Sequence, residues 1–352
     1  MVTTSMATGG IQSVVRDLSE ELVARGNRVG VVSICGTDAV ETGPGVLRWS
    51  FGLPRLAGNM VQAVRRLLQV IAEFEPDVVH SHAFHANLVA QTATWGKKKP
   101  PCVKTIHSVR EGGAIHRVIS RGMELSGPSS VAVSRAVASA HGLDSGAHII
   151  YNAIDLERFA FSADSRVHVR RDLGLGASDR LVVSVGRLTP AKDFRTLIAA
   201  AVRACDMQPH LHLAIVGDGP LKEELSAQIE RSNASSRIRM LGARPDVPAL
   251  LSAADLYVQS SAWEGFPLAP IEAMASGLKV LATDVGGTGE LRPLPVLLRP
   301  RDVYAMENAL RHAERYVRSD SERRGSAALL GHYSLDTLAQ EWVDEYERVR
   351  ME

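Results

Sequence analysis

Residues 256–282 read LYVQSSAWEGFPLAPIEAMASGLKVLA, in which two short apolar runs flank a helical stretch. Pro267 and Pro270 place the start of that helix, because proline is tolerated only within the first turn, where backbone N–H groups have no intrahelical partner. Gly277 predicts its end. The stretch therefore predicts a strand, a helix and a second strand, which is the repeating unit of parallel sheets covered by helices.

The same alternation continues through most of the chain, and it predicts an α/β protein. In the first half the expected strands are residues 2–4, 28–34, 46–51, 77–81, 102–106, 130–133 and 148–151. In the second half they are residues 181–185, 211–216, 238–241, 256–259 and 280–282. Ligands in such sheets bind at the carboxyl ends of the strands, so residues just after strands are the candidates for chemistry.

A chain of 352 residues with 45% hydrophobic content is long enough for two domains. Between about residues 156 and 179 the alternation gives way to charged and small residues, and we place the boundary there. The expected domains are residues 1–160 and 178–335. Residues 336–352 are expected to form a terminal helix that docks near the domain junction through Trp342 and Tyr346.

The charge balance of 40 basic and 39 acidic side chains gives no global attraction to nucleic acid. Local basic runs, at residues 65–66 and 97–99, allow peripheral contact with an anionic membrane, although solvated surface charges are the alternative. Cys35, Cys102 and Cys205 are few, odd in number and far apart, which favours a reducing compartment. With no apolar run of membrane-spanning length and no signal-peptide pattern, we expect a cytoplasmic protein, at most peripheral at the inner membrane face.

The start of the helix after residue 265 resembles an anion site, because backbone N–H groups around Gly265, Phe266 and Leu268 lie at its positive end. Glu264 precedes this start and Glu272 lies inside the helix. Carboxylates are good acceptors for sugar hydroxyls, so the ligand implied carries both phosphate and sugar. The alternative is that Glu264 caps the helix and Glu272 is solvated.

The segment GRLTPAK, residues 186–192, places two cations after a predicted strand. Arg187 can engage phosphate oxygens as a fork, and Lys192 adds a point charge that stabilises a departing diphosphate. Two solvated cations near Asp193 are the alternative. A turn at residues 217–220, Gly-Asp-Gly-Pro, either borders the same ligand or is only structural.

Two positions in the first half are further candidates. Gly9 and Gly10 lie between the first strand and the first helix, where glycines let a phosphate approach the backbone, although a tight turn needs the same residues. His107 directly follows a strand and can hydrogen-bond a sugar hydroxyl or a phosphate, or it is merely structural.

The histidines at 80, 82, 85 and 107 all lie near predicted strand ends, which raises the possibility of a zinc site. Period-two spacing places His80 and His82 on one face of a strand, and three imidazoles can bind zinc. His85 is expected to lie already in a helix, and no acidic ligand is near in the sequence, so we expect no metal.

Taken in order, these segments resemble the retaining glycosyltransferases of family 4, of the glycosyltransferase group 1 type. Their fold is GT-B, in which two Rossmann-like, doubly wound parallel-sheet domains face a central cleft. The matching segments are residues 9–10, 105–107, 151–155, 186–192, 217–220, 264–272 and 284–290. Any one of these motifs is weak, but the ordered set is highly specific.

The resemblance implies a hexosyltransferase that moves a sugar from a UDP- or GDP-linked nucleotide sugar to an acceptor hydroxyl, with retained anomeric configuration. No metal or other cofactor is expected, because cations replace the metal. The first domain would bind the acceptor, which is a glycan, a lipid-linked sugar or a small molecule, and the second the donor. Synthesis of cell-surface polysaccharide or glycoconjugate is the expected context.

The resemblance also implies a role for each site residue. Arg187 and Lys192 would hold the diphosphate, and Glu272 the ribose. Glu264 would lie near the donor sugar, and His107 would contact that sugar from the opposite domain. The backbone N–H groups of the helix start would face sugar or phosphate; they belong to Gly265, Phe266 and Leu268.

Competing functions are a sugar-nucleotide epimerase on the same fold and a catalytically silent nucleotide-sugar binding protein. The first should carry additional acid and base groups around the sugar, and no convincing set is present. Retention of both cations and both acids argues against the second. A nicotinamide-dependent dehydrogenase is disfavoured, because no Gly-x-Gly-x-x-Gly follows a strand.

Overall fold

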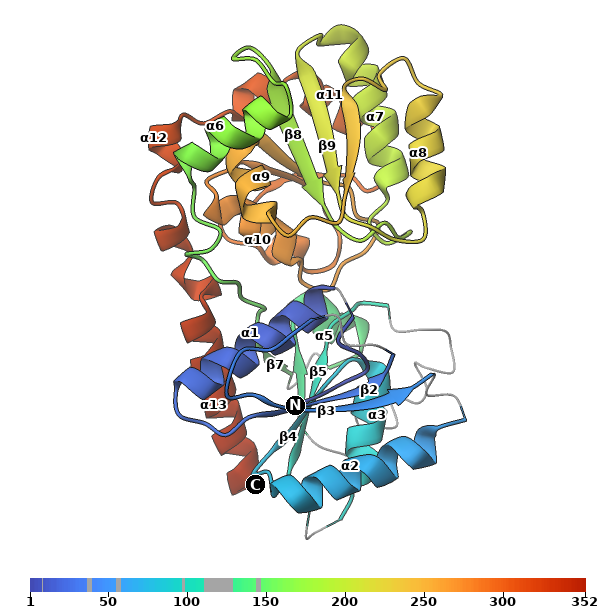
Figure 1. Cartoon of the computed structure of the whole chain (residues 1–352), viewed down its shortest axis with the longest axis vertical. Coiled ribbons are helices and arrows are strands. Elements are labelled where there is room, and N and C mark those ends of the chain that lie inside the picture. Colours follow the sequence, from blue (N-terminus) through green and yellow to red (C-terminus); the bar gives the residue numbers. More distant parts are fainter. Residues whose placement is uncertain (8, 37–39, 55–57, 97–98, 111–128, 144–146) are drawn as a thin grey trace. The chain divides into compact units, whose positions relative to one another are not determined.

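The structure, a computed structural model, describes residues 1–7, 9–36, 40–54, 58–96, 99–110, 129–143 and 147–352. Lys97 and Lys98 of the basic run therefore lie outside the described residues. The chain divides into two compact units (Figure 1). Unit 1 comprises Met1–Ile154 and His332–Glu352, and unit 2 comprises Asp155–Gly331.

Unit 1 is built on a parallel sheet, as predicted. Its described strands follow the spatial order β3-β2-β1-β4-β5-β6-β7. They are β1 Val2–Thr3, β2 Gly30–Cys35, β3 Leu47–Leu53, β4 Val79–His82, β5 Cys102–Ile106, β6 Ser130–Ala132 and β7 His148–Ile149. The order reverses between β1 and β4, so this pair of strands is the switch point of the sheet.

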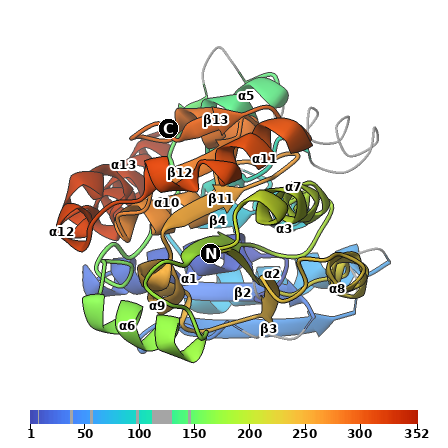
Figure 2. The same cartoon turned by 90° about the horizontal axis from the view of Figure 1, so that it is seen from above.

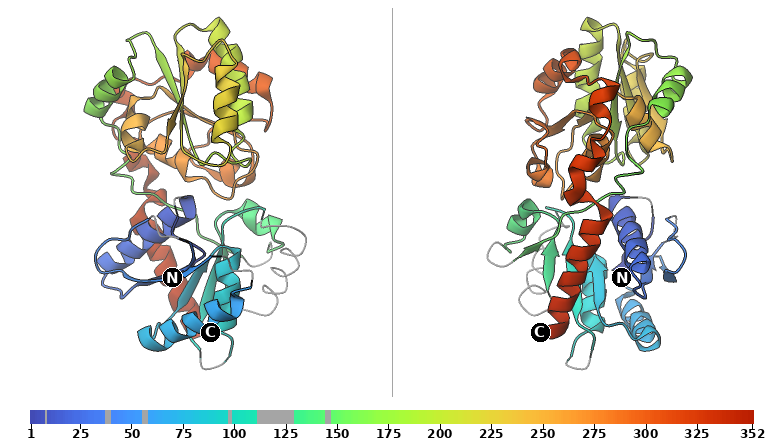
Figure 3. Two further views of the ribbon diagram at one scale, coloured as in Figure 1. Left: turned by 45° about the vertical axis from the view of Figure 1, so that its right-hand side comes forward. Right: turned by 90° about the vertical axis from the view of Figure 1, so that its left-hand side faces the viewer.

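Helices pack on both faces of this sheet. The described ones are α1 Gly10–Ala24, α2 Met60–Phe74, α3 Phe84–Ala93, α5 Arg135–Ala140 and α13 Leu335–Met351. Leu18 of α1 and Trp342 of α13 share a core with Val103 of β5. Figure 3 shows α13 lying along the sheet of unit 1. A second core, which includes Leu67 of α2 and Val89 of α3, fills the other side.

Unit 2 has its own parallel sheet, with the described strands in the order β10-β9-β8-β11-β12-β13. They are β8 Arg180–Val185, β9 Leu211–Val216, β10 Ile238–Gly242, β11 Leu256–Gln259, β12 Val280–Thr283 and β13 Val296–Leu298. The order reverses between β8 and β11. Both sheets therefore confirm the predicted Rossmann-like, doubly wound class.

The helices of unit 2 also cover both faces. They are α6 Ala163–Asp172, α7 Phe194–Met207, α8 Lys222–Glu230, α9 Val247–Ala253, α10 Leu268–Ala275, α11 Val303–Arg311 and α12 Asp320–Arg323, with short 3-10 turns at Gly286–Glu290, Ala313–Tyr316 and Ala327–Tyr333. A core between the sheet and α7, α8 and α11 contains Leu197, Leu225 and Met306. Helices α9 and α10 pack on the strands from the other side, because right-handed crossovers on either side of a switch point place helices on opposite faces. Helix α6 lies beside α9 (Figure 2).

Two elements were not expected from the sequence. Helix α6 lies in the segment where the alternation disappears, and β13 follows the last strand that was predicted. Among the described residues, no helix combines the length and the apolar character that crossing a membrane requires.

Candidate active site

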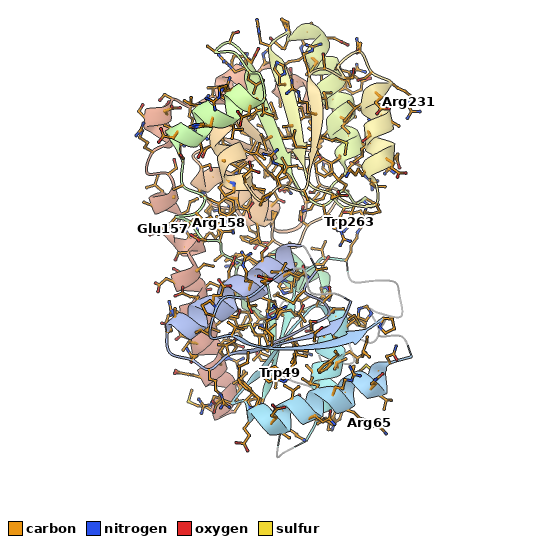
Figure 4. The ribbon with its side chains drawn as sticks, in the orientation of Figure 1. Trp49, Arg65, Glu157, Arg158, Arg231 and Trp263 are labelled. Carbon is orange, nitrogen blue, oxygen red and sulfur yellow. The ribbon has the colours of Figure 1, made fainter. Side chains whose placement is uncertain are left out.

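In unit 2 the loops that follow four adjacent strands meet at the carboxyl edge of the sheet, around its switch point. Trp263, labelled in Figure 4, lies in the loop after β11. Ala262 N donates to Ala191 O at 2.7 Å, and Ser260 Oγ donates to Lys192 O at 2.8 Å, so the loops after β11 and β8 are bonded directly. This edge carries most of the residues predicted from the sequence.

The loops after β9 and β12 close on the same edge, and two glycines make this possible. A Cβ atom on Gly217, whose φ is 145°, would lie 2.0 Å from Gly186 O. A Cβ atom on Gly286, whose φ is 53°, would lie 2.0 Å from Glu264 O. Because no other residue fits such approaches, these glycines set the spacing between neighbouring loops.

Helix α10 forms where the prolines predict it. Pro267 is its N-cap, and Gly277, with a φ of 75°, follows its C-cap. Pro267 has no polar side-chain atom with which to cap the helix, and the donors to the Glu264 carboxylate are the side chains of Lys192, Ser261 and Gln259 rather than backbone N–H groups of α10, which argues against the alternative in which Glu264 caps the helix. Glu272 is half-buried within the helix, and Leu268 is its first residue.

The side chain of Glu264 is instead bound to Lys192. Lys192 Nζ lies 2.5 Å from Glu264 Oε1, and the two side chains are only 27% and 11% exposed. The same oxygen accepts from Ser261 Oγ at 2.5 Å and from Gln259 Nε2 at 3.4 Å. Three donors thus converge on Oε1 and fix the orientation of the carboxylate.

Arg187 differs from Lys192, although both lie in one loop. Arg187 is exposed, and within the described part of the chain its guanidinium has no hydrogen bond or ion pair. Asp193 does not hold Lys192; it accepts from Thr196 Oγ1 at 2.8 Å. The alternative of two solvated cations near Asp193 is therefore wrong for Lys192.

A buried tyrosine beneath the two acids was missed by the sequence reasoning. Tyr257 of β11 is 1% exposed and donates from its hydroxyl to Val185 O at 3.3 Å. Burial, and then the nearby carboxylates of Glu272 and Glu264, raise the pKa of Tyr257. Gln259 and Ser261 were also missed, although their period-two spacing at a strand end is a signal that they share a side.

In unit 1 the predicted residues lie near the other switch point. Gly9 is the N-cap of α1, which begins at Gly10 directly after the turn that follows β1. His107 follows β5, and its Nε2 lies 3.1 Å from Nδ1 of His82, the last residue of β4. Burial lowers the pKa of His107 to about 4, so this imidazole is neutral at physiological pH.

Of the histidines named for a zinc site, His80 and His82 make hydrogen bonds to other side chains, and His85 is exposed. The rings of His80 and His82 lie on one face, 4.0 Å apart, as the spacing predicts. His80 Nδ1 is 2.7 Å from the hydroxyl of Tyr346, and its Nε2 is 2.6 Å from Thr105 Oγ1, so neither nitrogen is available to a metal. His85 is exposed on α3. No group of three or more His, Cys, Asp or Glu side chains in the described ranges could hold a metal ion.

Family models match both halves of the chain. The model for Glycosyltransferase Family 4 matches residues 8–158, and the model for Glycosyl transferases group 1 matches residues 166–292. These ranges contain every residue that the sequence analysis assigned to the site.

Curated relatives match mainly over part of their length. A UDP-Gal:alpha-D-GlcNAc-diphosphoundecaprenol alpha-1,3-galactosyltransferase of Escherichia coli is 34% identical over 40% of this chain and 37% of the relative. The lipopolysaccharide core biosynthesis mannosyltransferase LpsB of Rhizobium meliloti is 31% identical over 41% and 42%. The putative teichuronic acid biosynthesis glycosyltransferase TuaC of Bacillus subtilis is 28% identical over 77% and 68%. The chain thus spans about two fifths of the first two relatives.

Solved structures match over the whole chain. HepE of Anabaena, in complex with UDP and glucose, has a TM-score of 0.81 at 21% identity and covers 99% of both chains. Sucrose-phosphate synthase of Thermosynechococcus elongatus has a TM-score of 0.83 at 20% identity, over 99% of this chain and 98% of that one. At these identities the likeness establishes the fold.

Proposed function

The chain belongs to the GT-B glycosyltransferases that combine a family 4 module with a group 1 module, and from this premise we propose that it transfers a sugar from a nucleoside diphosphate sugar to an acceptor hydroxyl, with retention at the anomeric carbon. The observation that carries the proposal is the cluster at the switch point of unit 2. There Lys192 contacts Glu264 directly, and Arg187 lies exposed in the same loop as Lys192.

The two cations supply the electrostatic part of the proposed reaction. A glycosyl transition state separates an oxocarbenium-like sugar from a departing diphosphate, on which negative charge grows. The guanidinium of Arg187, which has no partner among the described residues, can donate two parallel N–H bonds to two phosphate oxygens. Lys192 offers its ammonium once it exchanges the Glu264 carboxylate for phosphate. The positive end of α10, at Gly265, Phe266 and Leu268, adds to the same field. We therefore propose a reaction that is independent of metal.

The acids are proposed to hold the uncharged parts of the donor. Donors converge on Oε1 of Glu264, and its Oε2 has no hydrogen bond within the described residues, which leaves Oε2 to accept from a sugar hydroxyl. Glu272, one turn inside α10, is proposed to accept from the ribose. Glutamate suits both tasks because an ionised carboxylate only accepts hydrogen bonds.

Retention is proposed to follow from attack on the face that the diphosphate leaves. The bond between the anomeric carbon and the phosphate oxygen breaks, and a bond to the acceptor oxygen forms. The acceptor proton moves to the departing phosphate oxygen, so no protein nucleophile is required. His107, a neutral imidazole, is proposed to hydrogen-bond the transferred sugar. Gly9 and Gly10 are proposed to let substrate approach the start of α1.

The acceptor is proposed to be a lipid-linked sugar, with a glycan or small molecule as the other substrate classes, in polysaccharide or glycoconjugate synthesis. The names of curated relatives support this, since one of them acts on a sugar linked to diphosphoundecaprenol. Peripheral membrane contact is part of the same proposal, through exposed Arg65 on α2 and Lys99. Binding to anionic but not neutral vesicles, weakened in Arg65→Glu, is the expected result; equal binding to both would contradict it.

The decisive experiment is a screen of UDP- and GDP-linked sugars for thermal stabilisation and turnover, with the product anomer assigned by NMR. We expect a glycoside of retained configuration, and activity that persists in excess chelator. An isomerised free nucleotide sugar would indicate an epimerase, and stabilisation without turnover would indicate a silent binding protein. Loss of activity in chelator, restored by a divalent cation, would overturn metal independence.

Variants test the cation cluster directly. Arg187→Ala and Lys192→Ala should each lower kcat by about a hundredfold, which is typical for the loss of one charge-stabilising group. The melting temperature should not change in Arg187→Ala, because Arg187 is exposed. In Lys192→Ala it should fall slightly, because the largely covered Glu264 carboxylate loses its cation, so the kcat of this variant is measured well below its melting temperature. Arg231→Ala, an exposed arginine that follows α8, is the matched control. Unchanged turnover in both site variants would remove the cations from the mechanism.

A further inference from the structure

A column of aromatic rings in unit 1 ends at His107. The indole of Trp342 in α13 lies 4.0 Å from the His80 ring, and the His80 ring lies 4.0 Å from the His82 ring, both measured between centroids. His82 is bonded in turn to His107, Nδ1 to Nε2, at 3.1 Å. The neighbouring His80 ring and the hydrogen bond to His107 limit the rotation of His82, so its orientation is well defined.

His82 occupies a distinctive position. It is the last residue of β4, which borders the switch point of the unit 1 sheet, and it is only 1% exposed. Its second ring nitrogen, Nε2, is buried and has no hydrogen-bond partner among the described residues. His82 therefore makes one side-chain hydrogen bond there, and that bond goes to His107.

This single bond couples the proton positions of the two rings. A neutral imidazole carries one N–H, so one ring must donate and the other accept. If His107 donates from Nε2, then His82 keeps its proton on Nε2, where it meets no acceptor. If His82 donates from Nδ1, then His107 keeps its proton on Nδ1. Buried N–H groups without an acceptor are rarer in proteins than buried acceptors without a donor, which favours the second arrangement.

We propose that His82 is a positioning residue for His107: it donates Nδ1–H to Nε2 of His107, fixes that ring, and keeps the His107 proton on Nδ1. His107 then presents a hydrogen-bond donor, rather than an acceptor, to the sugar. The inference rests on the role of His107 in the proposed function. To that role it adds which ring nitrogen of His107 carries the proton, and it identifies His82 as the residue that determines this.

Nitrogen-15 NMR of the imidazole rings tests the tautomer in the unmodified protein. Protonated and unprotonated ring nitrogens have well-separated shifts, and His107→Gln assigns the His107 signals. We expect Nδ1 of His107 to be protonated and Nε2 to be unprotonated near neutral pH. Protonation of His107 at Nε2, or rapid exchange between the two tautomers, would overturn the inference. This measurement needs neither activity nor a folded His82 variant.

Two substitutions at His82 separate the hydrogen bond from packing. His82→Phe keeps a buried ring but no donor, whereas His82→Asn keeps an amide N–H near the position of Nδ1. His82→Phe should lower kcat about tenfold, with the KM of the donor nearly unchanged, and should allow His107 to exchange tautomers. His82→Asn should restore most of kcat. His85→Phe, on the exposed side of α3, is the control and should match the parent protein.

The failures of the two claims can be told apart. Parent-like kcat and an unchanged His107 spectrum in His82→Phe would overturn the inference but leave the proposed function intact. Full turnover in His107→Ala would instead remove His107 from the proposed function, while the spectrum of the unmodified protein still decides whether His82 sets its tautomer.

Discussion

Lys192 and Glu264 form an ion pair, and this pair determines how a diphosphate could reach Lys192. The ammonium lies 2.5 Å from Oε1 and is largely covered by protein. A phosphate group must therefore displace the carboxylate to obtain the full charge of Lys192. Ser261 is fully buried and also donates to Oε1, so we expect Glu264 to stay in position when Lys192 changes partner.

We predict that Glu264→Gln binds nucleoside diphosphate more tightly yet turns over more slowly. Removing the carboxylate charge frees Lys192, and an ion pair that solvent still reaches is worth about 0.5–1 kcal/mol, so affinity should rise about twofold to fivefold. Turnover should fall by about a hundredfold or more, because the ionised acceptor for the sugar is lost. Titration calorimetry and kcat measure the two effects.

The control for this prediction is Glu230→Gln, which removes an exposed acid at the end of α8. It should change neither affinity nor turnover. Weaker binding of the diphosphate to Glu264→Gln would contradict the exchange and would indicate that Glu264 itself supports the phosphates.

A second prediction at the residue scale concerns pH. Burial lowers the pKa of His107 to about 4 and the pKa values of His80 and His82 well below 6.5. Between these values and the ordinary histidine pKa near 6.5, the unfolded chain binds more protons than the folded one, so stability falls as pH falls. The urea midpoint should therefore decrease from pH 7 to pH 5.

His82→Asn removes one of these groups, so its urea midpoint should depend less steeply on pH over the same range. Circular dichroism and tryptophan fluorescence follow the transition. A midpoint that is flat, or that rises on acidification, would show that these rings are not held neutral.

The sequence identified Arg187, Lys192, Glu264 and Glu272 as candidate site residues, because the first three lie in loops after strands and Glu272 lies in the helix that one of these loops opens. It did not indicate that Lys192 and Glu264 touch. They are 72 positions apart and meet only because β8 and β11 are neighbours in the sheet, and strand order cannot be read from alternation. Contacts that depend on strand order are thus the part of the site that required the structure.

At the scale of elements, a buried arginine binds the end of the helix that carries Glu272. Arg323 of α12 donates to Ser276 O at the end of α10, and to Ala254 O and Leu251 O at the end of α9, each at 2.9 Å. Its guanidinium also lies over the ring of Phe161. The carbonyls that a helix C-terminus leaves unpaired are satisfied here largely by Arg323, with Arg166 as a second donor to Ala254 O at 2.9 Å.

We predict that Arg323→Met lowers the free energy of unfolding by about 3–5 kcal/mol, because Ser276 O and Leu251 O lose this donor and Ala254 O keeps only the bond from Arg166. Arg324→Met is the matched control, since Arg324 is the next residue and is exposed. Denaturant unfolding of both variants measures the difference. Equal stability of the two variants would mean that the carbonyls find other donors.

Helix α6 shows why one element escaped the sequence analysis. None of its residues is buried, so it lacks the apolar period by which helices are recognised. Its signals are those of capping: Ser162 accepts from Ser165 N, Asp164 lies in the first turn, and Arg170 and Arg171 lie in the last. Strand β13 is a short apolar run between Pro295 and Pro300, and prolines so close on both sides argue against a strand. The longer elements were predicted correctly because their apolar residues recur with a clear period.

For the whole molecule, the alternation of strands and helices was enough to predict two parallel sheets, since each βαβ unit specifies its own local pairing. The unit to which the last segment, His332–Glu352, belongs depends instead on packing against residues far away in the sequence. Unit 1 is assembled from two pieces of chain, Met1–Ile154 and His332–Glu352. Unit 2 is one continuous piece, Asp155–Gly331, and contains Arg187, Lys192, Glu264 and Glu272.

This difference predicts opposite outcomes for two truncations. Residues 155–331 alone should fold cooperatively and bind nucleoside diphosphate, because their core and the proposed diphosphate site lie within one segment. Residues 1–331 should contain an unstable unit 1, because they lack Leu338, Trp342 and Val349, which are buried against α1 and the sheet. Burying such side chains contributes about 2 kcal/mol each, and more for tryptophan, against a total stability of about 5–15 kcal/mol for a domain.

Differential scanning calorimetry should show one transition for the first fragment and loss of the unit 1 transition in the second. Restoration of that transition by a synthetic peptide of residues 332–352 would establish that α13 completes the core, and a stable unit 1 without it would contradict this account of the fold.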